Sequence, residues 1–213
     1  MKYISLFENF KKVGETLFII DVQKSFSKFF TDKYLRELKK YCNHFEEVYQ
    51  IYDNHVEGKD VDTDYLYEID PDGSKIDDIY NFPNQVDVIE KRYNYDVDVD
   101  FYKKILSDEV YKLMKEKEKK NEFKRGDFFN TKHGTILVYI GNNHVWFHCP
   151  IKLYNLLKEC LELQKNDSDF SVTMVGGADQ ECFLDVETTA KALGLNIKRD
   201  FRFIYSAKHC PIK

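Results

Sequence analysis

Two short apolar runs, far apart along the chain, set narrow limits on the fold. The first, Leu17-Phe18-Ile19-Ile20, leads directly into Asp21. The second, Val172-Thr173-Met174-Val175, leads into a turn of small residues and then reaches Cys182. Apolar runs of this length are typical of parallel strands buried on both faces, and ligands gather at the carboxyl ends of such strands. The pattern therefore predicts an α/β fold that delivers a carboxylate to that edge of the sheet.

Cys182 stands at the start of a predicted helix, from Phe183 to Gly194. The N–H groups of a helix's first turn and the positive end of its dipole favour a thiolate, and they can also hold a developing oxyanion. Free cysteine is also among the most buried residue types, so simple packing is the competing explanation. The strand, turn and helix around Cys182 make it a candidate nucleophile.

Together, these two segments resemble the isochorismatase-like cysteine hydrolases, a family that includes nicotinamidases and related amidases. The resemblance rests on Asp21-Val22-Gln23 after the first apolar run, with Phe26 close behind. It rests equally on the Gly-x-Ala-x-x-x-Cys turn at residues 176–182. Ala190 and Gly194 follow the cysteine as the family's helix would have them. The resemblance covers the two ends of the chain and little of the middle.

The resemblance implies a doubly wound α/β domain with a mainly parallel sheet and helices on both faces. It also implies a site in which Asp21 takes the thiol proton, a lysine positions and polarises the site, and Cys182 attacks a carbonyl. Water then hydrolyses the acyl-enzyme, and no cofactor is expected. A thiol of pKa about 8.5 needs a base or a cation to become nucleophilic at neutral pH. Backbone N–H groups at Gly177 and Ala178 would stabilise the oxyanion.

Two lysines compete for the third position of this site. Lys91 ends the short predicted strand at residues 86–90, and Lys132 follows a second turn-and-strand pattern at residues 126–131. The interval from Asp21 to Lys91 is 91 − 21 = 70 residues, which suits a compact family member better than 132 − 21 = 111. We therefore expect Lys91 to be the catalytic lysine, with Lys132 as the alternative.

The middle of the chain contains a pattern that a parallel core does not need. Residues 135–140 and 144–148 alternate in polarity around Gly141-Asn142-Asn143, which predicts a β-hairpin. We expect one isochorismatase-like domain over residues 1–213 with an insertion at about 100–165. Two predicted helices, Phe101 to Lys120 and Pro150 to Leu163, lie in that interval.

The remaining elements follow from local patterns. Ser25 to Asn43 is predicted as one helix, with Phe29, Tyr34, Leu35 and Leu38 on a single side. Residues 48–52 form the second predicted strand, and Ile197 to Tyr205 the last.

One departure from the family's pattern concerns the helix after the cysteine. The family usually places Thr-Ala at the fourth and fifth positions after it, and here they are Val186 and Glu187. A glutamate one turn from Cys182 can oppose a thiolate. This departure favours a catalytically silent protein over an active hydrolase.

The end of the second predicted strand is a candidate metal site. Asp53 and His55 resemble the Asp-x-His that binds metal in nicotinamidases, but no further histidine lies between His55 and Lys91. A catalytic metal normally has three protein ligands and an open position. We therefore expect no metal.

Composition excludes several classes of function. The net charge is −5 and no Lys/Arg patch interleaves with the aromatic residues, so we expect no nucleic-acid partner. No apolar run is long enough to span a membrane, and Met1 to Lys12 lacks the core of a signal peptide. Five cysteines without a Cys-x-x-Cys motif fit a reducing cytoplasm. We expect a cytoplasmic protein with a small-molecule substrate, and homo-oligomerisation stays open.

The leading interpretation is a cysteine hydrolase of a small amide or a related substrate. The alternative is a catalytically silent isochorismatase-like protein that binds or assembles, with the inserted hairpin as its contact surface. The long interval from Lys91 to Cys182 favours that alternative. A third interpretation is a structural cysteine in an unrelated α/β protein.

Overall fold

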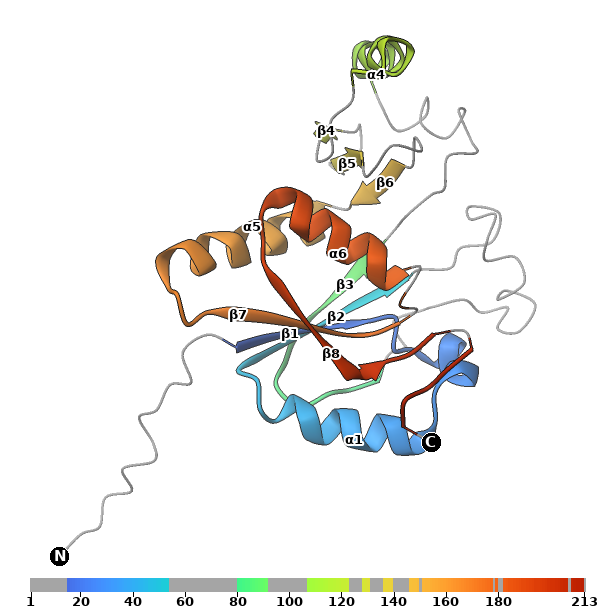
Figure 1. Ribbon diagram of the computed structural model, residues 1–213, viewed down its shortest axis with the longest axis vertical. Helices are drawn as coiled ribbons and strands as arrows, with labels where there is room; N and C mark the ends of the chain where they lie inside the picture. Colours follow the sequence, from blue (N-terminus) through green and yellow to red (C-terminus); the bar gives the residue numbers. More distant parts are fainter. Residues whose placement is uncertain are drawn as a thin grey trace, which may run out of the picture.

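The fold is described from a computed structural model (Figure 1). The residues that it describes are 15–53, 80–91, 107–122, 128–130, 136–139, 146–149, 151–177, 179, 182–206 and 208–212. The elements are β1 (Glu15–Ile20), the 3₁₀ helix η1 (Lys24–Phe29), α1 (Asp32–Cys42), β2 (Glu47–Asp53), β3 (Gln85–Lys91), α4 (Asp108–Lys120), β4 (Phe128–Asn130), β5 (Ile136–Tyr139), β6 (Trp146–Cys149), α5 (Ile151–Asn166), β7 (Ser171–Gly176), α6 (Cys182–Leu193) and β8 (Ile197–Ile204).

The main sheet has five strands in the order β3-β2-β1-β7-β8, and every pair is parallel. The chain moves outward from β1 to β2 and β3, then returns to the other side of β1 for β7 and β8. The strand order therefore reverses between β1 and β7. In open α/β sheets, ligands bind outside the carboxyl ends of the strands at such a reversal.

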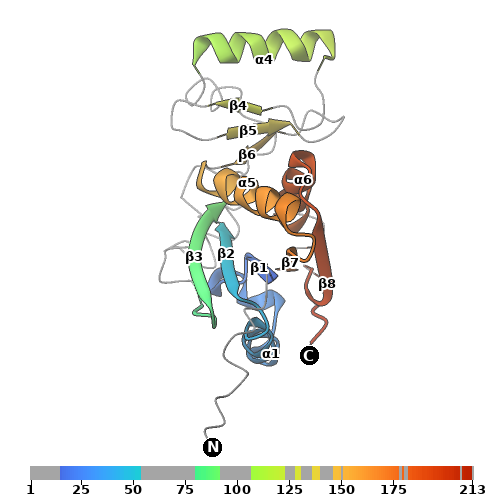
Figure 2. The same ribbon diagram turned by 90° about the vertical axis from the view of Figure 1, so that its left-hand side faces the viewer.

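Strand β1 is buried on both faces, as its unbroken apolar run predicts. Because successive side chains of a strand point to opposite faces, Leu17 and Ile19 pack in one apolar cluster and Phe18 and Ile20 in another. The first cluster includes buried residues of α1, and the second includes those of α5 and α6. Helices thus cover both faces of the sheet (Figures 1 and 2), and the predicted α/β class is confirmed.

The single helix predicted over residues 25–43 is wrong, because the chain breaks at Phe30 and Thr31. Phe30 has extended backbone angles, and the Thr31 side chain accepts a hydrogen bond from the Tyr34 N–H at 3.1 Å. A threonine in that position satisfies an N–H group that a helix end leaves open, which fixes the start of α1.

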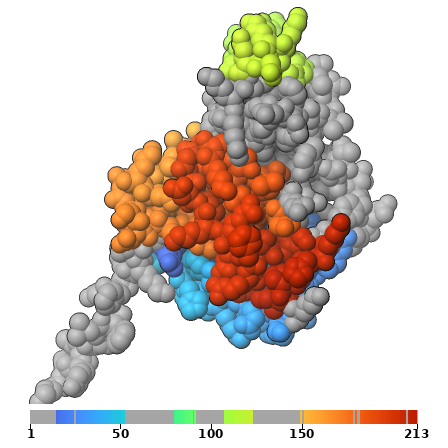
Figure 3. All heavy atoms as spheres, viewed as in Figure 1, coloured from blue at the N-terminus to red at the C-terminus, as the bar shows by residue number. Residues whose placement is uncertain are grey.

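The predicted hairpin exists. Strand β5 pairs with β6 in antiparallel register, with Val138 opposite Phe147, and β4 adds a third antiparallel strand. This small sheet and α4 lie at one end of the molecule (Figures 1 and 2), and α4 forms the tip in the space-filling view (Figure 3). Helix α4 begins after Ser107, whose hydroxyl accepts from the Val110 N–H.

Helix α5 belongs with the main sheet. Its predicted inward residues, Leu153, Leu156, Leu157, Cys160 and Leu161, are buried in the same cluster as Phe18 and Ile20 of β1. The interval of about 100–165 thus includes a helix that packs on the parallel core. Within the described residues, no helix has the length and apolar character needed to cross a bilayer.

Candidate active site at the carboxyl edge of the sheet

Asp21 lies directly after β1, at the point where the strand order reverses. Its backbone is left-handed, with φ of 50°, a conformation that Asp adopts more readily than most residues. The Asp21 N–H donates to the Ile51 carbonyl of β2 at 2.9 Å, and the residue is 1% exposed. The first turn after β1 therefore holds a carboxylate inside the protein.

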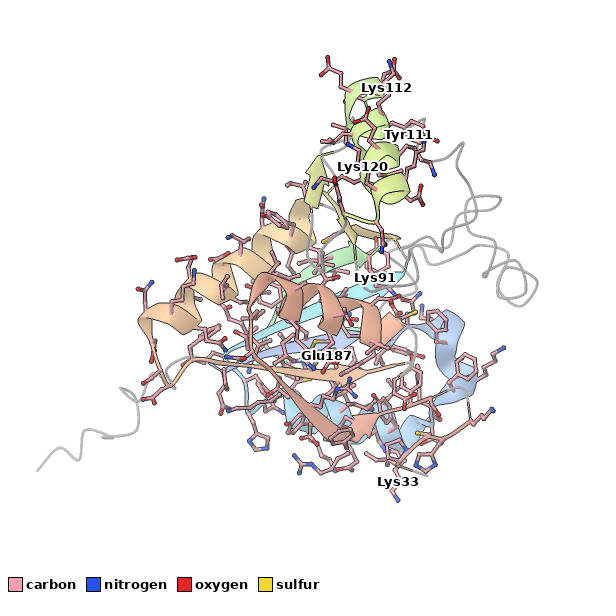
Figure 4. All side chains as sticks on the ribbon, turned by 45° about the horizontal axis from the view of Figure 1, so that its top comes forward. Lys33, Lys91, Tyr111, Lys112, Lys120 and Glu187 are labelled. Carbon is pink, nitrogen blue, oxygen red and sulfur yellow. The ribbon has the colours of Figure 1, made fainter. Side chains whose placement is uncertain are left out.

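Lys91, the last residue of β3, lies against that carboxylate. Its ammonium Nζ donates to Asp21 Oδ2 at 2.8 Å, and the lysine is 0% exposed. The two residues come from strands that β2 separates, so the lysine side chain reaches across the end of β2. The other ion pairs between described residues each keep at least one side chain partly exposed. Figure 4 labels Lys91 at this edge.

The turn after β7 is built on close contact with β1. Gly176 has φ of 103°, and a Cβ atom there would lie 2.0 Å from the Ile20 carbonyl oxygen. Only glycine fits that position, because both the conformation and the space exclude a side chain. This contact brings the β7–α6 turn next to Asp21, which follows Ile20.

Cys182 is the first residue of α6 and is 5% exposed. It belongs to the apolar cluster between the sheet and helices α5 and α6. The cysteine thus stands in a helix's first turn, as predicted, and is buried.

The backbone N–H groups of Gly177 and Ala178 are the two donors that were expected to hold an oxyanion, and the structure describes only the first of them. The Gly177 N–H donates to the Ile20 carbonyl at 3.0 Å, so the fold already uses this donor. Ala178 lies outside the described residues. An oxyanion site at this turn therefore has to draw on donors other than the Gly177 N–H.

Tyr205 contacts this edge from the end of β8 and was not singled out from the sequence. Its hydroxyl donates to the Asp21 carbonyl oxygen at 2.6 Å. Burial first, and then the charge of Asp21, raise the pKa of Tyr205 well above its usual value, and Cys182 acts in the same direction. Tyr205 therefore contacts Asp21 directly. A lone aromatic residue at a strand end gives no sequence signal for this role.

Glu187, which was expected to oppose a thiolate, is held by two cations. Arg199 of β8 makes a two-pronged ion pair with it, donating from Nε at 2.6 Å and from Nη2, and Lys191 Nζ lies at 2.9 Å. The hydrogen bond from Arg199 is the main cause that lowers the pKa of Glu187. Its negative charge is therefore largely compensated within α6 and β8.

Several predicted residues cannot be placed. Lys132, His55 and His144 lie outside the described residues, and of Asp53 only the backbone is described, in register with Lys91. Among the described residues, no group of three or more His, Cys, Asp or Glu could hold a metal ion.

The other cysteines give a useful contrast to Cys182. Burial raises the pKa of Cys42 and of Cys160 to about 12, and raises that of Cys149 further. Cys210, near the end of the chain, is partly exposed.

Comparison with known proteins finds no relative: no family model, no curated protein and no solved structure matches this chain. The fold class therefore rests on the strand order and its helices, and the function rests on the chemistry of the carboxyl edge.

Proposed function

We propose that this chain is a cysteine hydrolase of the isochorismatase-like kind, acting on a small amide or a related acyl substrate, with Asp21, Lys91 and Cys182 as its catalytic residues. The observation that carries the proposal is the buried Asp21–Lys91 ion pair at the reversal of strand order. Cys182 begins the helix that follows the neighbouring strand.

A buried ion pair needs an explanation other than stability. Removing two charges from water costs several kcal/mol per ion, and apolar residues of similar volume often hold a fold equally well. Charged groups gathered at a ligand-binding edge are the arrangement that catalysis requires. Lys91 and Asp21 fit that requirement, because they lie at the edge where the β7–α6 turn meets β1.

Each residue then has one chemical task. Asp21 accepts the proton of the Cys182 thiol, and the Lys91 ammonium holds the carboxylate in place and adds positive potential. The thiolate attacks the substrate carbonyl, and the carbon–nitrogen bond breaks as the amine leaves with the proton from Asp21. Water attacks the thioester and gives one proton to Asp21; as the carbon–sulfur bond breaks, Asp21 returns that proton to the sulfur, which releases the acid and the free thiol.

The test is turnover of a panel of small amides by the wild-type chain and by Cys182→Ser. A serine hydroxyl is far harder to ionise than a thiol, so hydrolysis should be abolished while stability changes by no more than about 1–2 kcal/mol. Asp21→Asn should also lose turnover, since an amide cannot accept the proton. Cys160→Ser, a buried cysteine of the same apolar cluster, is the matched control and should keep full activity.

A second candidate is the catalytically silent protein that binds or assembles. The burial of Cys182 among apolar residues favours it, because packing alone accounts for such a cysteine. Under this alternative, Cys182→Ser and Asp21→Asn keep partner binding, and substitutions at Trp146 and Phe147 of β6 abolish it. A panel without hydrolysis, together with a partner lost only on the β6 substitutions, would overturn the hydrolase.

A further inference from the structure

Tyr205 connects two parts of the candidate site that lie far apart along the chain. It follows the last strand, β8, yet its hydroxyl reaches the Asp21 carbonyl at the end of β1. Its backbone N–H donates to the Gly176 carbonyl at 2.9 Å, and its carbonyl accepts from the Asp179 N–H at 3.1 Å. One residue thus fixes the strand end that holds the carboxylate and the turn that leads to Cys182.

The ring of Tyr205 is closely packed by neighbouring residues. A Cβ atom on Gly177 would lie 2.4 Å from this ring, so the turn packs directly on its face. The rings of Phe30 and Tyr34 also lie close to it, 5.3 and 6.0 Å away, centre to centre. Rings packed on this scale have few alternative positions, so the hydroxyl is aimed at the Asp21 backbone.

The Tyr205 hydroxyl binds a residue, Asp21, whose backbone conformation is unfavourable by itself. Asp21 is left-handed at φ of 50°, and left-handed geometry costs a non-glycine residue about 1 kcal/mol or more. A hydrogen bond to the carbonyl of that residue favours this one conformation over extended alternatives. The Asp21 side chain points from that backbone to Lys91, so the backbone conformation determines whether the ion pair forms.

We propose that Tyr205 is a positioning residue that holds Asp21 in register with Lys91 and with the turn before Cys182. For its catalytic meaning this inference rests on the proposed function. Burial raises the pKa of Tyr205 well above its usual value, which favours the protonated hydroxyl that donates this hydrogen bond.

The test compares Tyr205→Phe with Tyr34→Phe. Each substitution removes one buried hydroxyl and keeps the ring, and the Tyr34 hydroxyl also donates to a backbone carbonyl, that of Phe203 at 2.8 Å. Only the Tyr205 bond ends on a residue of the candidate site. Tyr34→Phe is therefore the control for losing a buried hydrogen bond in the same aromatic cluster.

Two readouts separate positioning from general stability. The first is hydrogen exchange of the Asp21 amide relative to the Val172 amide in the same sheet. The second is the rate at which iodoacetamide alkylates Cys182 at neutral pH. Tyr205→Phe should raise the relative exchange of Asp21 and lower Cys182 alkylation, each by a factor of roughly five, the usual value of one net hydrogen bond. Tyr34→Phe should change neither ratio.

Equal ratios in the two variants would overturn the positioning role. Should Tyr205→Phe fail to fold, the test uses 4-aminophenylalanine at position 205, because its amino group can still donate a hydrogen bond to the Asp21 carbonyl. A folded chain with that residue should alkylate at the wild-type rate, and loss of alkylation in it would contradict the inference. If wild-type Cys182 reacts no faster than Cys149, the proposed function fails. Hydrogen exchange of the Asp21 amide then still tests whether Tyr205 holds the Asp21 backbone.

Discussion

Two buried acidic side chains, Asp21 and Glu187, form ion pairs that differ in the exposure and the number of their cationic partners. Asp21 and Lys91 are both buried, and they come from strands that do not touch each other. Glu187 is also buried, but its partner Arg199 is 29% exposed and Lys191 supplies a second cation from the next turn of the helix. The first pair lies at the carboxyl edge of the sheet, and the second joins α6 to β8. Glu187 is labelled on α6 in Figure 4.

The difference indicates two purposes. Glu187 has redundant cations that water also reaches, so either cation can be lost without leaving a buried charge alone. Arg199 further packs over the Phe183 ring, 5.3 Å from its centre, as a structural contact does. The Asp21–Lys91 pair has no exposed member, and such pairs are poor sources of stability. The difference therefore supports a structural role for the Glu187–Arg199 pair, and it supports the catalytic role proposed for the Asp21–Lys91 pair.

The largest effect is expected from Lys91→Met, which keeps most of the length of the side chain and removes its charge. Asp21 would then be a buried carboxylate without its ammonium partner, and breaking a buried pair in this way costs about 3–5 kcal/mol. Amide turnover should also be lost. Denaturant unfolding and an amide assay measure the two effects.

The double variant Asp21→Asn with Lys91→Met separates stability from chemistry. It removes both charges, so it should recover much of the stability that Lys91→Met loses, while turnover stays absent. Recovery of turnover in the double variant would show that the pair has no catalytic task.

A smaller effect is expected from Arg199→Met. Lys191 remains beside Glu187, and the lost guanidinium was partly exposed, so we expect a loss of about 1–2 kcal/mol. Turnover should stay within a few-fold of the wild type. A loss of stability as large as that of Lys91→Met would remove the distinction between the two pairs.

The smallest effect is a change in acid stability through Glu187. Arg199 lowers the pKa of Glu187 in the folded chain. The stabilisation from a lowered carboxyl pKa is complete above the unfolded value of about 4.3 and is lost as the pH falls through the folded value. The stability difference between wild type and Glu187→Gln should therefore shrink below about pH 4. Unfolding curves from neutral to acidic pH measure it, and a constant difference would contradict the assignment.

The sequence predicted those helices and strands in which apolar residues form a continuous run or recur at a regular spacing. The runs before Asp21 and Cys182 predict buried strands, and the inward face of α5 follows from helical spacing. Lys91 follows from the family resemblance, together with a strand signal and the interval from Asp21, and it contacts that carboxylate.

The parts that the sequence did not predict depend on contacts distant along the chain. The break before Thr31 follows from a cap, which competed with a helical pattern on both sides. Tyr205 meets Asp21 only because β7 lies between β1 and β8, and the Gly177 N–H is engaged only because β1 is its neighbour. No local pattern encodes these neighbours.

The most direct measurement of the central claim is the alkylation rate of all five cysteines by iodoacetamide across pH, read by mass spectrometry of each peptide. Cys210 is partly exposed and Cys182 is 5% exposed, so access alone makes Cys210 react first. An activated thiol reverses that order. We predict that Cys182 reacts fastest at neutral pH and loses this advantage in Lys91→Met, while Cys42, Cys149 and Cys160 stay slow because burial raises their pKa. Cys210 reacting first, with Cys182 as slow as the three buried cysteines, would contradict the account.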